Sequence, residues 1–148
     1  MNNATAGARR WHYALTGLLL NAAGAAQAGT AIQLTATPGL QAGPVRDGTL
    51  LMRGRVSSDT PHAGFRLWCA AGVAEGDSVR CVLTGQRHAG HILRVRLSGG
   101  GWQPGPPPEG GVMTINAERS VAFRIEADGD QSAAADTWIM ALNAATTE

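Results

Sequence analysis

The sequence predicts an all-β protein, an antiparallel β-sandwich, and three observations favour this class. Polar and apolar residues alternate over short segments, which is the two-residue period of a half-buried strand. Turn-forming clusters rich in Gly, Pro, Ser and Asp separate these segments. Beyond residue 28, no stretch of about ten residues or more shows the helical period. Short strands with frequent turns are typical of sandwiches.

Two of the clearest strand patterns lie within residues 46–69, after the turn signal Asp47-Gly48. In residues 49–56 one face carries Leu50, Met52 and Val56, and the other carries Thr49, Arg53 and Arg55. In residues 64–69 one face carries Phe65, Leu67 and Cys69, and the other carries Arg66 and Trp68. Because only the polar segment SSDTPHAG separates the two strands, we expect them to form a hairpin in the core.

Further strands are expected at residues 32–37, 79–84, 91–97, 120–127 and 137–143, with a short one at 112–115. Three of them have apolar residues alternating on one side: Leu93, Val95 and Leu97; Val121, Phe123 and Ile125; Trp138, Met140 and Leu142. The segment 98–111 is rich in Gly and Pro and is expected to be a loop.

The first 28 residues have the pattern of a secretory signal. Arg9 and Arg10 precede a short apolar segment, which ends at Ala26-Gln27-Ala28. The apolar run is shorter than the roughly 20 residues of a membrane span. We expect cleavage after Ala28, which leaves residues 29–148 as one domain with one core. The alternative is a short N-terminal helix that stays attached.

The chain contains two cysteines, Cys69 and Cys81. Val79, Cys81 and Leu83 share one face of their strand, so both sulfurs are expected to point into the same layer. In an exported protein this pair predicts a disulfide. Closing so short a loop contributes roughly 3 kcal/mol in the chain-entropy model. The alternative is two buried free thiols.

The charge balance gives no case for a nucleic-acid partner. The chain has 12 Lys+Arg against 11 Asp+Glu, a formal net charge of +1. Removal of Arg9 and Arg10 with the signal makes the remaining chain slightly negative. Such a balance lacks the basic excess of nucleic-acid-binding domains.

Two sets of residues carry side chains found in catalytic or metal sites. His88 and His91 have the composition of a metal pair, but zinc needs three or four ligands and no further His or Cys is near in sequence. The alternative is a polar turn that leads into a strand. Ser57, His62 and Asp59 contain the residue types of a hydrolase triad, but no G-x-S-x-G elbow is present. We therefore expect no enzyme activity, no metal and no cofactor.

Two groups of exposed residues are candidate contacts with a receptor. The outward arginines Arg53, Arg55, Arg94 and Arg96 are a candidate anion- or receptor-binding patch, or else an ordinary solvated strand face. Trp102, between GGG and PPP, is an aromatic on a loop, and such a side chain buries a large area at low entropic cost. The alternative is that Trp102 folds back and plugs one end of the sandwich.

The last predicted strand suggests an incomplete sandwich. Only residues 144–148 follow it, whereas an immunoglobulin-type sandwich closes its sheets with one more strand. A missing strand leaves an open edge and uncovered core side chains, which is both an aggregation hazard and a docking groove. We expect Trp138, Met140 and Leu142 to border this groove.

A series of short motifs, in order and at similar spacing, resembles the AfaD/DraD invasins. The motifs are Arg46-Asp47-Gly48, Gly54-Arg55, His62, Gly64-Phe65, Trp68, His91 with Leu93-Arg94-Val95-Arg96, Gly101-Trp102, and Ala127-Asp128-Gly129 with Gln131. The resemblance implies an incomplete immunoglobulin-like antiparallel β-sandwich, lacking its last strand and completed by a donor strand through edge-strand addition. It also implies a tip subunit, an adhesin or invasin, of a bacterial surface pilus. Its implied partners are a periplasmic chaperone, an outer-membrane usher, a neighbouring subunit and an integrin-type host receptor.

The resemblance fails at the cysteines. The family places its pair at the end of the second strand and in the C-terminal strand, where this chain has Ser57-Ser58 and Asn143-Ala144. Receptor contacts of the family do not transfer to a motif here. Two alternatives stay open. One is a shaft subunit, for which the alternating segment AIQLTAT would be the donor strand, and the other is a secreted binding module unrelated to pili.

Overall fold

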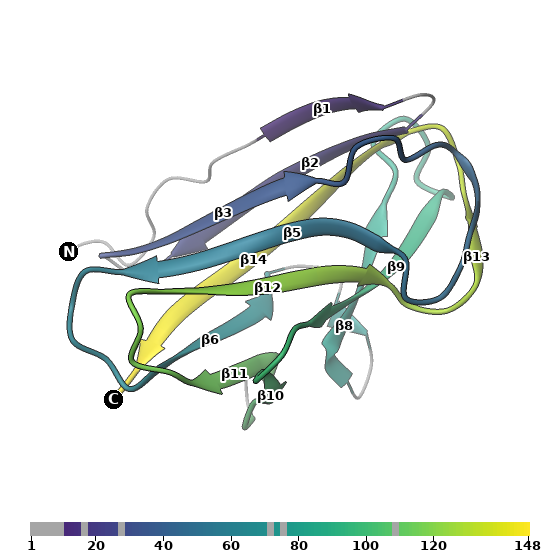
Figure 1. Ribbon diagram of the computed structural model, residues 1–148. Helices are drawn as coiled ribbons and strands as arrows, with labels where there is room; N and C mark the ends of the chain where they lie inside the picture. Colours follow the sequence, from purple (N-terminus) through teal and green to yellow (C-terminus); the bar gives the residue numbers. More distant parts are fainter. Residues whose placement is uncertain (1–10, 16–17, 27–28, 71–72, 75–76, 108–109) are drawn as a thin grey trace.

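The computed structural model describes residues 11–15, 18–26, 29–70, 73–74, 77–107 and 110–148, with side chains described at 29–70, 79–107 and 110–148. All regular structure in these residues is β-strand, which confirms the all-β prediction (Figure 1). Among them, no helix long and apolar enough to cross a membrane is found.

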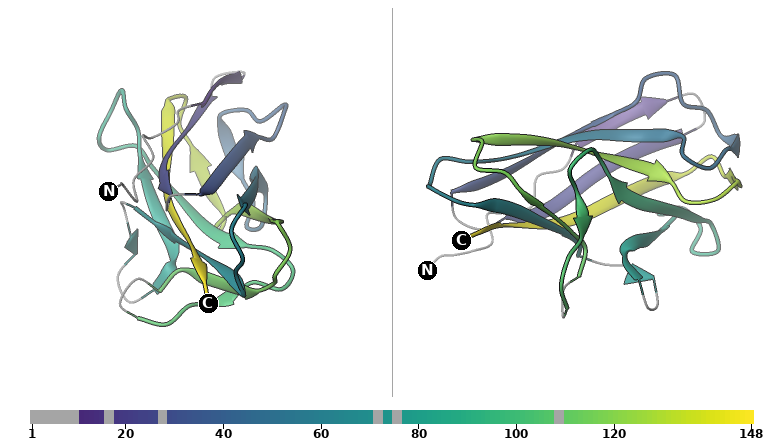
Figure 2. Two further views of the ribbon diagram at one scale, coloured as in Figure 1. Left: turned by 90° about the vertical axis from the view of Figure 1, so that its left-hand side faces the viewer. Right: turned by 60° about the horizontal axis from the view of Figure 1, so that its bottom comes forward.

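Two six-stranded sheets form the layers of the sandwich. The first sheet has the order β1 (Trp11–Leu15), β2 (Leu18–Ala26), β14 (Thr137–Thr147), β6 (Gly64–Cys69), β11 (Val112–Ile115) and β10 (Gln103–Pro104). The second sheet has the order β3 (Thr30–Ala36), β5 (Leu50–Ser58), β12 (Ser120–Ala127), β9 (Ile92–Ser98), β8 (Asp77–Thr84) and β7 (Val73–Ala74). A small third sheet pairs β4 (Gly43–Val45) with β13 (Gln131–Ala133). The long strands β5, β12 and β14 follow the same long axis of the molecule (Figures 1 and 2).

The core lies between the sheets and is built from alternate residues of the long strands. The inward faces predicted for residues 64–69, 91–97 and 137–143 are confirmed, because their alternate apolar side chains are buried. The largest fully buried side chains of the whole core are Trp138, Phe65, Phe123 and Leu51. Burial of such side chains supplies the main favourable term in folding.

The hairpin predicted between β5 and β6 is wrong, because the two strands lie in different sheets. β5 pairs with β3 and β12, whereas β6 pairs with β14 and β11. The connection at residues 59–63 therefore carries the chain from the second sheet to the first. Consecutive strands are neighbours in only about two-thirds of cases, and the alternation of a strand does not say which strand lies beside it.

β5 contains a bulge that changes one predicted core position. Ile125 lies opposite Met52, and the next residue, Glu126, lies opposite Leu50, so that Leu51 is an extra residue in β5. Leu51 is buried and Leu50 only partly so. The core position predicted for Leu50 is therefore occupied by Leu51.

Two predicted boundaries also change. The last strand continues to Thr147 rather than ending at Asn143. It extends because its second half pairs with β6, up to Thr147 opposite Gly64. The predicted loop at 98–111 contains the two-residue strand β10, which pairs with β11.

The predicted disulfide is present, between Cys69 at the end of β6 and Cys81 in β8. The Cα atoms of the two residues are 6.4 Å apart. Because β6 belongs to the first sheet and β8 to the second, the bond joins the two layers across the core.

Candidate functional site

The candidate site is built on β14. Its side chains alternate strictly from Trp138 to Ala144: Trp138, Met140 and Leu142 are exposed by 0%, 1% and 1%. The residues between them are only partly buried. One face of β14 therefore forms part of the core, as the alternation predicts.

Different strands pair with the two edges of β14. On one edge, β6 runs antiparallel, from Cys69 opposite Leu142 to Gly64 opposite Thr147. On the other edge, β2 runs parallel, along residues 137–144 of β14 (Figure 1). We call this second edge, over residues 137–144, the β14 edge. β2 also contacts β3 of the second sheet, so it connects the two layers on this side of the sandwich.

The strand on the β14 edge belongs to the segment that the sequence predicts to be removed. β2 covers Leu18–Ala26, within residues 1–28. Residues 1–10, 16–17 and 27–28 of the predicted signal lie outside the described residues. Loss of β2 would leave the ladder N–H and C=O groups of the β14 edge unpaired and would uncover core side chains. The site is thus a position shaped for one extended strand, which the register 19–26 opposite 137–144 defines.

Asp136, immediately before β14, holds the start of this strand against the turn between β8 and β9. Its buried carboxylate accepts hydrogen bonds from three backbone N–H groups, those of Thr137 at 2.6 Å, Arg87 at 2.8 Å and His88 at 3.3 Å. It also accepts a hydrogen bond from Nδ1 of His91 at 2.8 Å. Burial raises the pKa of Asp136, but these hydrogen bonds, that of Arg87 first, outweigh it and hold the pKa well below its usual range. Asp136 therefore fixes where the β14 edge begins.

His88 and His91 lie in the turn that leads into β9, where the non-metal alternative places them. Their rings stack with centroids 4.7 Å apart. Nδ1 of His91 contacts Asp136, and Nδ1 of His88 accepts the backbone N–H of Gly90 at 3.0 Å. Within the described residues, no group of three or more His, Cys, Asp or Glu side chains is placed to hold a metal ion.

The four candidate arginines divide into two pairs. Arg96 is surrounded by carboxylates: Nη1 lies 2.6 Å from Asp47 and 3.4 Å from Asp128, and Nη2 lies 3.4 Å from Glu126. The backbone N–H of Gly129 and the Arg96 guanidinium hold the pKa of Asp47 below its usual range. Arg96 therefore joins the turn at Asp47-Gly48 to the turn at Asp128-Gly129, which are two of the motifs quoted above.

Arg94 is also committed to the fold. Its backbone N–H donates to Oε1 of Gln131 at 2.9 Å, and its backbone C=O accepts from Nε2 of Gln131 at 2.8 Å. Gln131 thus pairs with β9 as a strand backbone would. The Arg94 guanidinium donates to the C=O of Asp130 at 3.4 Å.

Arg53 and Arg55 behave differently. Both are exposed on the outward side of β5, and in the described part of the chain neither forms an ion pair. Arg124 of β12 lies directly opposite Arg53 and is also exposed. The alternation places Arg124 outward, but nothing in the sequence puts β12 beside β5, so the sequence alone does not group these three residues.

Trp102 folds back onto the sandwich. It is half-buried, its Nε1–H donates to the C=O of Ala122 at 2.8 Å, and its ring meets Phe123 edge to face at a centroid distance of 6.3 Å. β9 pairs with β12 only from Arg124 onward, so the indole occupies the edge of β12 beyond the end of β9. The structure thus has the second of the two placements considered for Trp102, in which the side chain packs against the sandwich.

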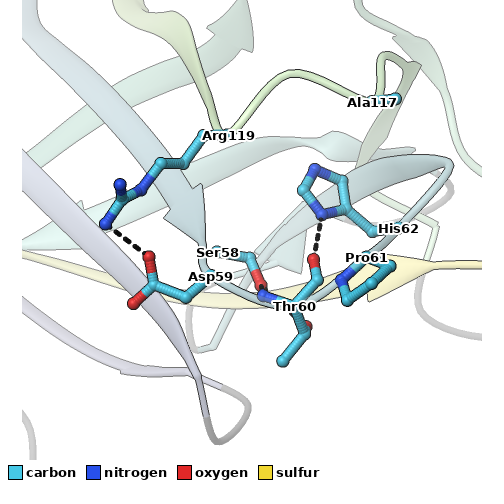
Figure 3. Close-up of a pocket in the computed structure, with 7 residues that line it drawn as sticks. All are labelled: Ser58, Asp59, Thr60, Pro61, His62, Ala117 and Arg119. Carbon is cyan, nitrogen blue, oxygen red and sulfur yellow. Dashed lines mark hydrogen bonds and ion pairs between the residues drawn. The ribbon is translucent and has the colours of Figure 1, made fainter.

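The candidate hydrolase triad of Ser57, His62 and Asp59 does not form in the structure. Ser58, Asp59, Thr60, Pro61, His62, Ala117 and Arg119 line an open hollow of about 470 Å³ between two loops (Figure 3). Nδ1 of His62 lies 2.6 Å from the C=O of Thr60 and Nε2 lies 2.7 Å from the C=O of Glu118. Both ring nitrogens of His62 therefore face backbone carbonyl oxygens and neither contacts a serine hydroxyl. Asp59 pairs with Arg119 instead of His62.

Solved structures that resemble this sandwich include a bacterial adhesin and a pilus tip subunit. The Salmonella SafD adhesin aligns with a TM-score of 0.75 and 32% identity over 80% of this chain and 84% of its own. The minor tip subunit HdaB of the Escherichia coli Hda pilus aligns with a TM-score of 0.73 and 25% identity over 80% and 82% of the two chains. These similarities define the class of protein: a subunit of a cell-surface fimbria, and not an enzyme.

The sequence comparisons identify the family. Residues 41–144 match the model of the Enterobacteria AfaD invasin protein. Protein AggB of Escherichia coli is 31% identical over 100 residues, which cover 67% of this chain and 68% of AggB. The chain therefore belongs to the AfaD invasin family.

Proposed function

We propose that this protein is the tip subunit, an adhesin or invasin, of a chaperone–usher adhesive pilus, and that residues 1–28 are its export signal. The observation that carries the proposal is the β14 edge. In the described part of the chain only β2 pairs with it, and β2 lies in the segment predicted to be cleaved. A donor strand, from a periplasmic chaperone and then from a neighbouring subunit delivered by an outer-membrane usher, would take the place of β2.

The physics of strand addition fits this edge. A strand beside residues 137–144 pairs its backbone with the free ladder groups, and its alternate side chains cover Trp138, Met140 and Leu142. The similarity to SafD, described as an adhesin, and to HdaB, described as a minor tip subunit, supports the same assembly for this chain. The exposed surfaces of the subunit would then contact a receptor on a host cell, of the integrin type in the resemblance described above.

The tip position is favoured over the shaft position by β3. The segment AIQLTAT, which the shaft alternative requires as a donor, lies almost entirely in β3 and pairs in register with β5, from Thr30 opposite Ser58 to Ala36 opposite Met52. A segment committed to its own sheet is not available to complete a neighbour. With cleavage after Ala28, only Gly29 precedes this strand.

A peptide experiment tests the proposal. The exported chain, with Gly29 confirmed as its N-terminus by mass spectrometry, is mixed with the nine-residue peptide LLLNAAGAA that corresponds to β2. The peptide should raise the melting temperature, by linkage about 2.7 kcal/mol of stability at about 100 times its Kd. The same chain should leave the periplasm bound to a chaperone.

Two altered peptides are the matched controls. Asp at the positions of Leu20, Ala22 and Gly24, which lie opposite Trp138, Met140 and Leu142, should abolish the gain. Asp at the positions of Leu19, Asn21 and Ala23, which lie opposite the outward-facing residues Thr137, Ile139 and Ala141, should leave most of it. An exported chain that is monomeric and equally stable with and without the peptide would contradict the proposal and favour a secreted binding module unrelated to pili.

A further inference from the structure

The outward side of the second sheet carries a strip of positive charge. Arg53 and Arg55 alternate along β5, which places them about 7 Å apart on one face. Arg124 of β12 lies directly opposite Arg53 across the antiparallel ladder. We call the exposed side chains of Arg53, Arg55 and Arg124 the arginine face.

The arginine face is short of counter-charge. Among the described residues, the guanidinium group of Arg53 has no ion-pair or hydrogen-bond partner, and Nη1 of Arg55 donates only to the hydroxyl of Ser120, at 2.5 Å. Arg124 contacts Glu126 at 2.9 Å, but Glu126 is shared with Arg96. One carboxylate therefore serves two arginines, and the other two arginines of the strip have none.

The ladder register makes this arrangement costly for the isolated protein. Like charges directly opposite each other on antiparallel strands repel, because their side chains stand on the same face at close range. The pair Arg53 and Arg124 is such a contact. An anion lying between the two guanidinium groups would turn the repulsion into two attractions.

The neighbouring strand adds uncharged hydrogen-bonding groups. On β3, Thr35 lies opposite Arg53 and Gln33 lies opposite Arg55, and both are exposed. An amide and a hydroxyl beside guanidinium groups suit a ligand that carries hydroxyl groups as well as anions. The strip therefore extends over the three adjacent strands β3, β5 and β12. On the outward positions of these strands, Glu126 is the only carboxylate.

We propose that the arginine face binds a sulfated polysaccharide, a linear chain in which sulfate groups and hydroxyl groups recur. Guanidinium forks match sulfate oxygens in two-point hydrogen bonds, and an extended polyanion reaches several of them at once. A single small anion would meet only one or two of the charges. The inference deepens the proposed function by naming the chemistry of the receptor, and it rests on that function only for display at the cell surface.

The test measures affinity for a heparin octasaccharide on the exported chain in the presence of the β2 peptide, or without it if the peptide proves unnecessary. The double variant Arg53→Ser/Arg55→Ser should lose about tenfold or more, because charge-assisted hydrogen bonds are lost. The slope of log affinity against log salt should also fall, because fewer counterions are released. The melting temperature should not fall, since both side chains are exposed and the variant removes the repulsion between Arg53 and Arg124.

The matched control is Arg46→Ser/Arg87→Ser, which removes the same charge from two exposed arginines outside β3, β5 and β12. It should change the affinity by less than about twofold, since the field of distant charges is screened by salt. A loss as large as that of the first variant would overturn the proposal, since net charge alone would then explain binding. Equal affinity for a DNA oligonucleotide, for anionic lipid vesicles or for fully desulfated heparin would overturn it as well.

The outcomes separate this inference from the proposed function. If the β2 peptide stabilises the chain but heparin does not bind, only the polysaccharide assignment fails. If heparin binds through Arg53 and Arg55 but the peptide has no effect, the pilus assignment fails and the binding face remains.

Discussion

The β14 edge and the arginine face lie in different sheets and differ in the physics by which each would hold a partner. A strand on the β14 edge pairs with backbone groups and covers Trp138, Met140 and Leu142, so the partner becomes part of the core. A ligand on the arginine face meets charged side chains that stand outside the fold. Substitutions at the β14 edge should therefore change stability and binding together, whereas substitutions at the arginine face should change binding alone.

The largest expected effect is at Trp138. Its side chain is fully buried, and Trp138→Ala should lower the free energy of unfolding of the peptide-bound chain by about 3–5 kcal/mol. Arg53→Ala, the matched change on the other surface, should stay within about 0.5 kcal/mol. Circular dichroism during thermal unfolding measures both. If the two variants have the same melting temperature, the side chains along the β14 edge are not part of the core, and the two surfaces do not differ as described.

The disulfide should have the next largest effect. Replacing Cys69 and Cys81 together by Ala should lower the free energy of unfolding by roughly 3 kcal/mol, because the bond restricts the unfolded chain. Where the peptide keeps the variant folded, its affinity for heparin should be unchanged, since both cysteines are buried between the sheets. Thiol titration of the unfolded, unreduced wild-type chain should find no free thiol. Two free thiols would refute the bond.

The smallest expected effect on stability distinguishes Arg96, which is surrounded by carboxylates, from Arg53 in the same sheet. Arg96→Ala should lower the free energy of unfolding by about 1 kcal/mol, a modest figure because the side chain is partly exposed and screened by solvent. Arg53→Ala should not lower it. Chemical denaturation at neutral pH gives both values, and equal values would mean that the carboxylates around Arg96 add nothing.

The same contrast should appear on acidification. The folded pKa of Asp47 is lowered from 3.8, so its stabilisation is fully present above that pH and is lost as the pH falls through the lower, folded value. Arg96→Ala removes one cause of this shift, and its deficit relative to wild type should therefore shrink in that range. For an Arg53→Ala control, the difference from wild type in the free energy of unfolding should not depend on pH.

Local patterns in the sequence predict most of the strands and the face that each one buries. The alternation in residues 64–69, 91–97 and 137–143 predicts the buried residues correctly. The matching faces of the two cysteine strands predict the disulfide, even though those strands lie in different sheets. The Arg-Asp-Gly and Ala-Asp-Gly motifs carry the family resemblance, and the contacts of Asp47 and Asp128 with Arg96 show that they act together in the fold.

The neighbours of each strand and the partners of each charge depend on the tertiary structure. Side-chain alternation has a period of two residues and reports burial, but pairing joins segments far apart in the chain, such as β5 with β12 and β14 with residues 19–26. For this reason the hairpin at 49–69 was wrong and the bulge at Leu51 was missed. The sequence by itself determines that Arg53, Arg55, Arg94 and Arg96 point outward. Only the register of the sheet decides that Arg96 meets three carboxylates and that Arg53 meets another arginine, because opposite and like charges are brought together by strands that the chain places far apart.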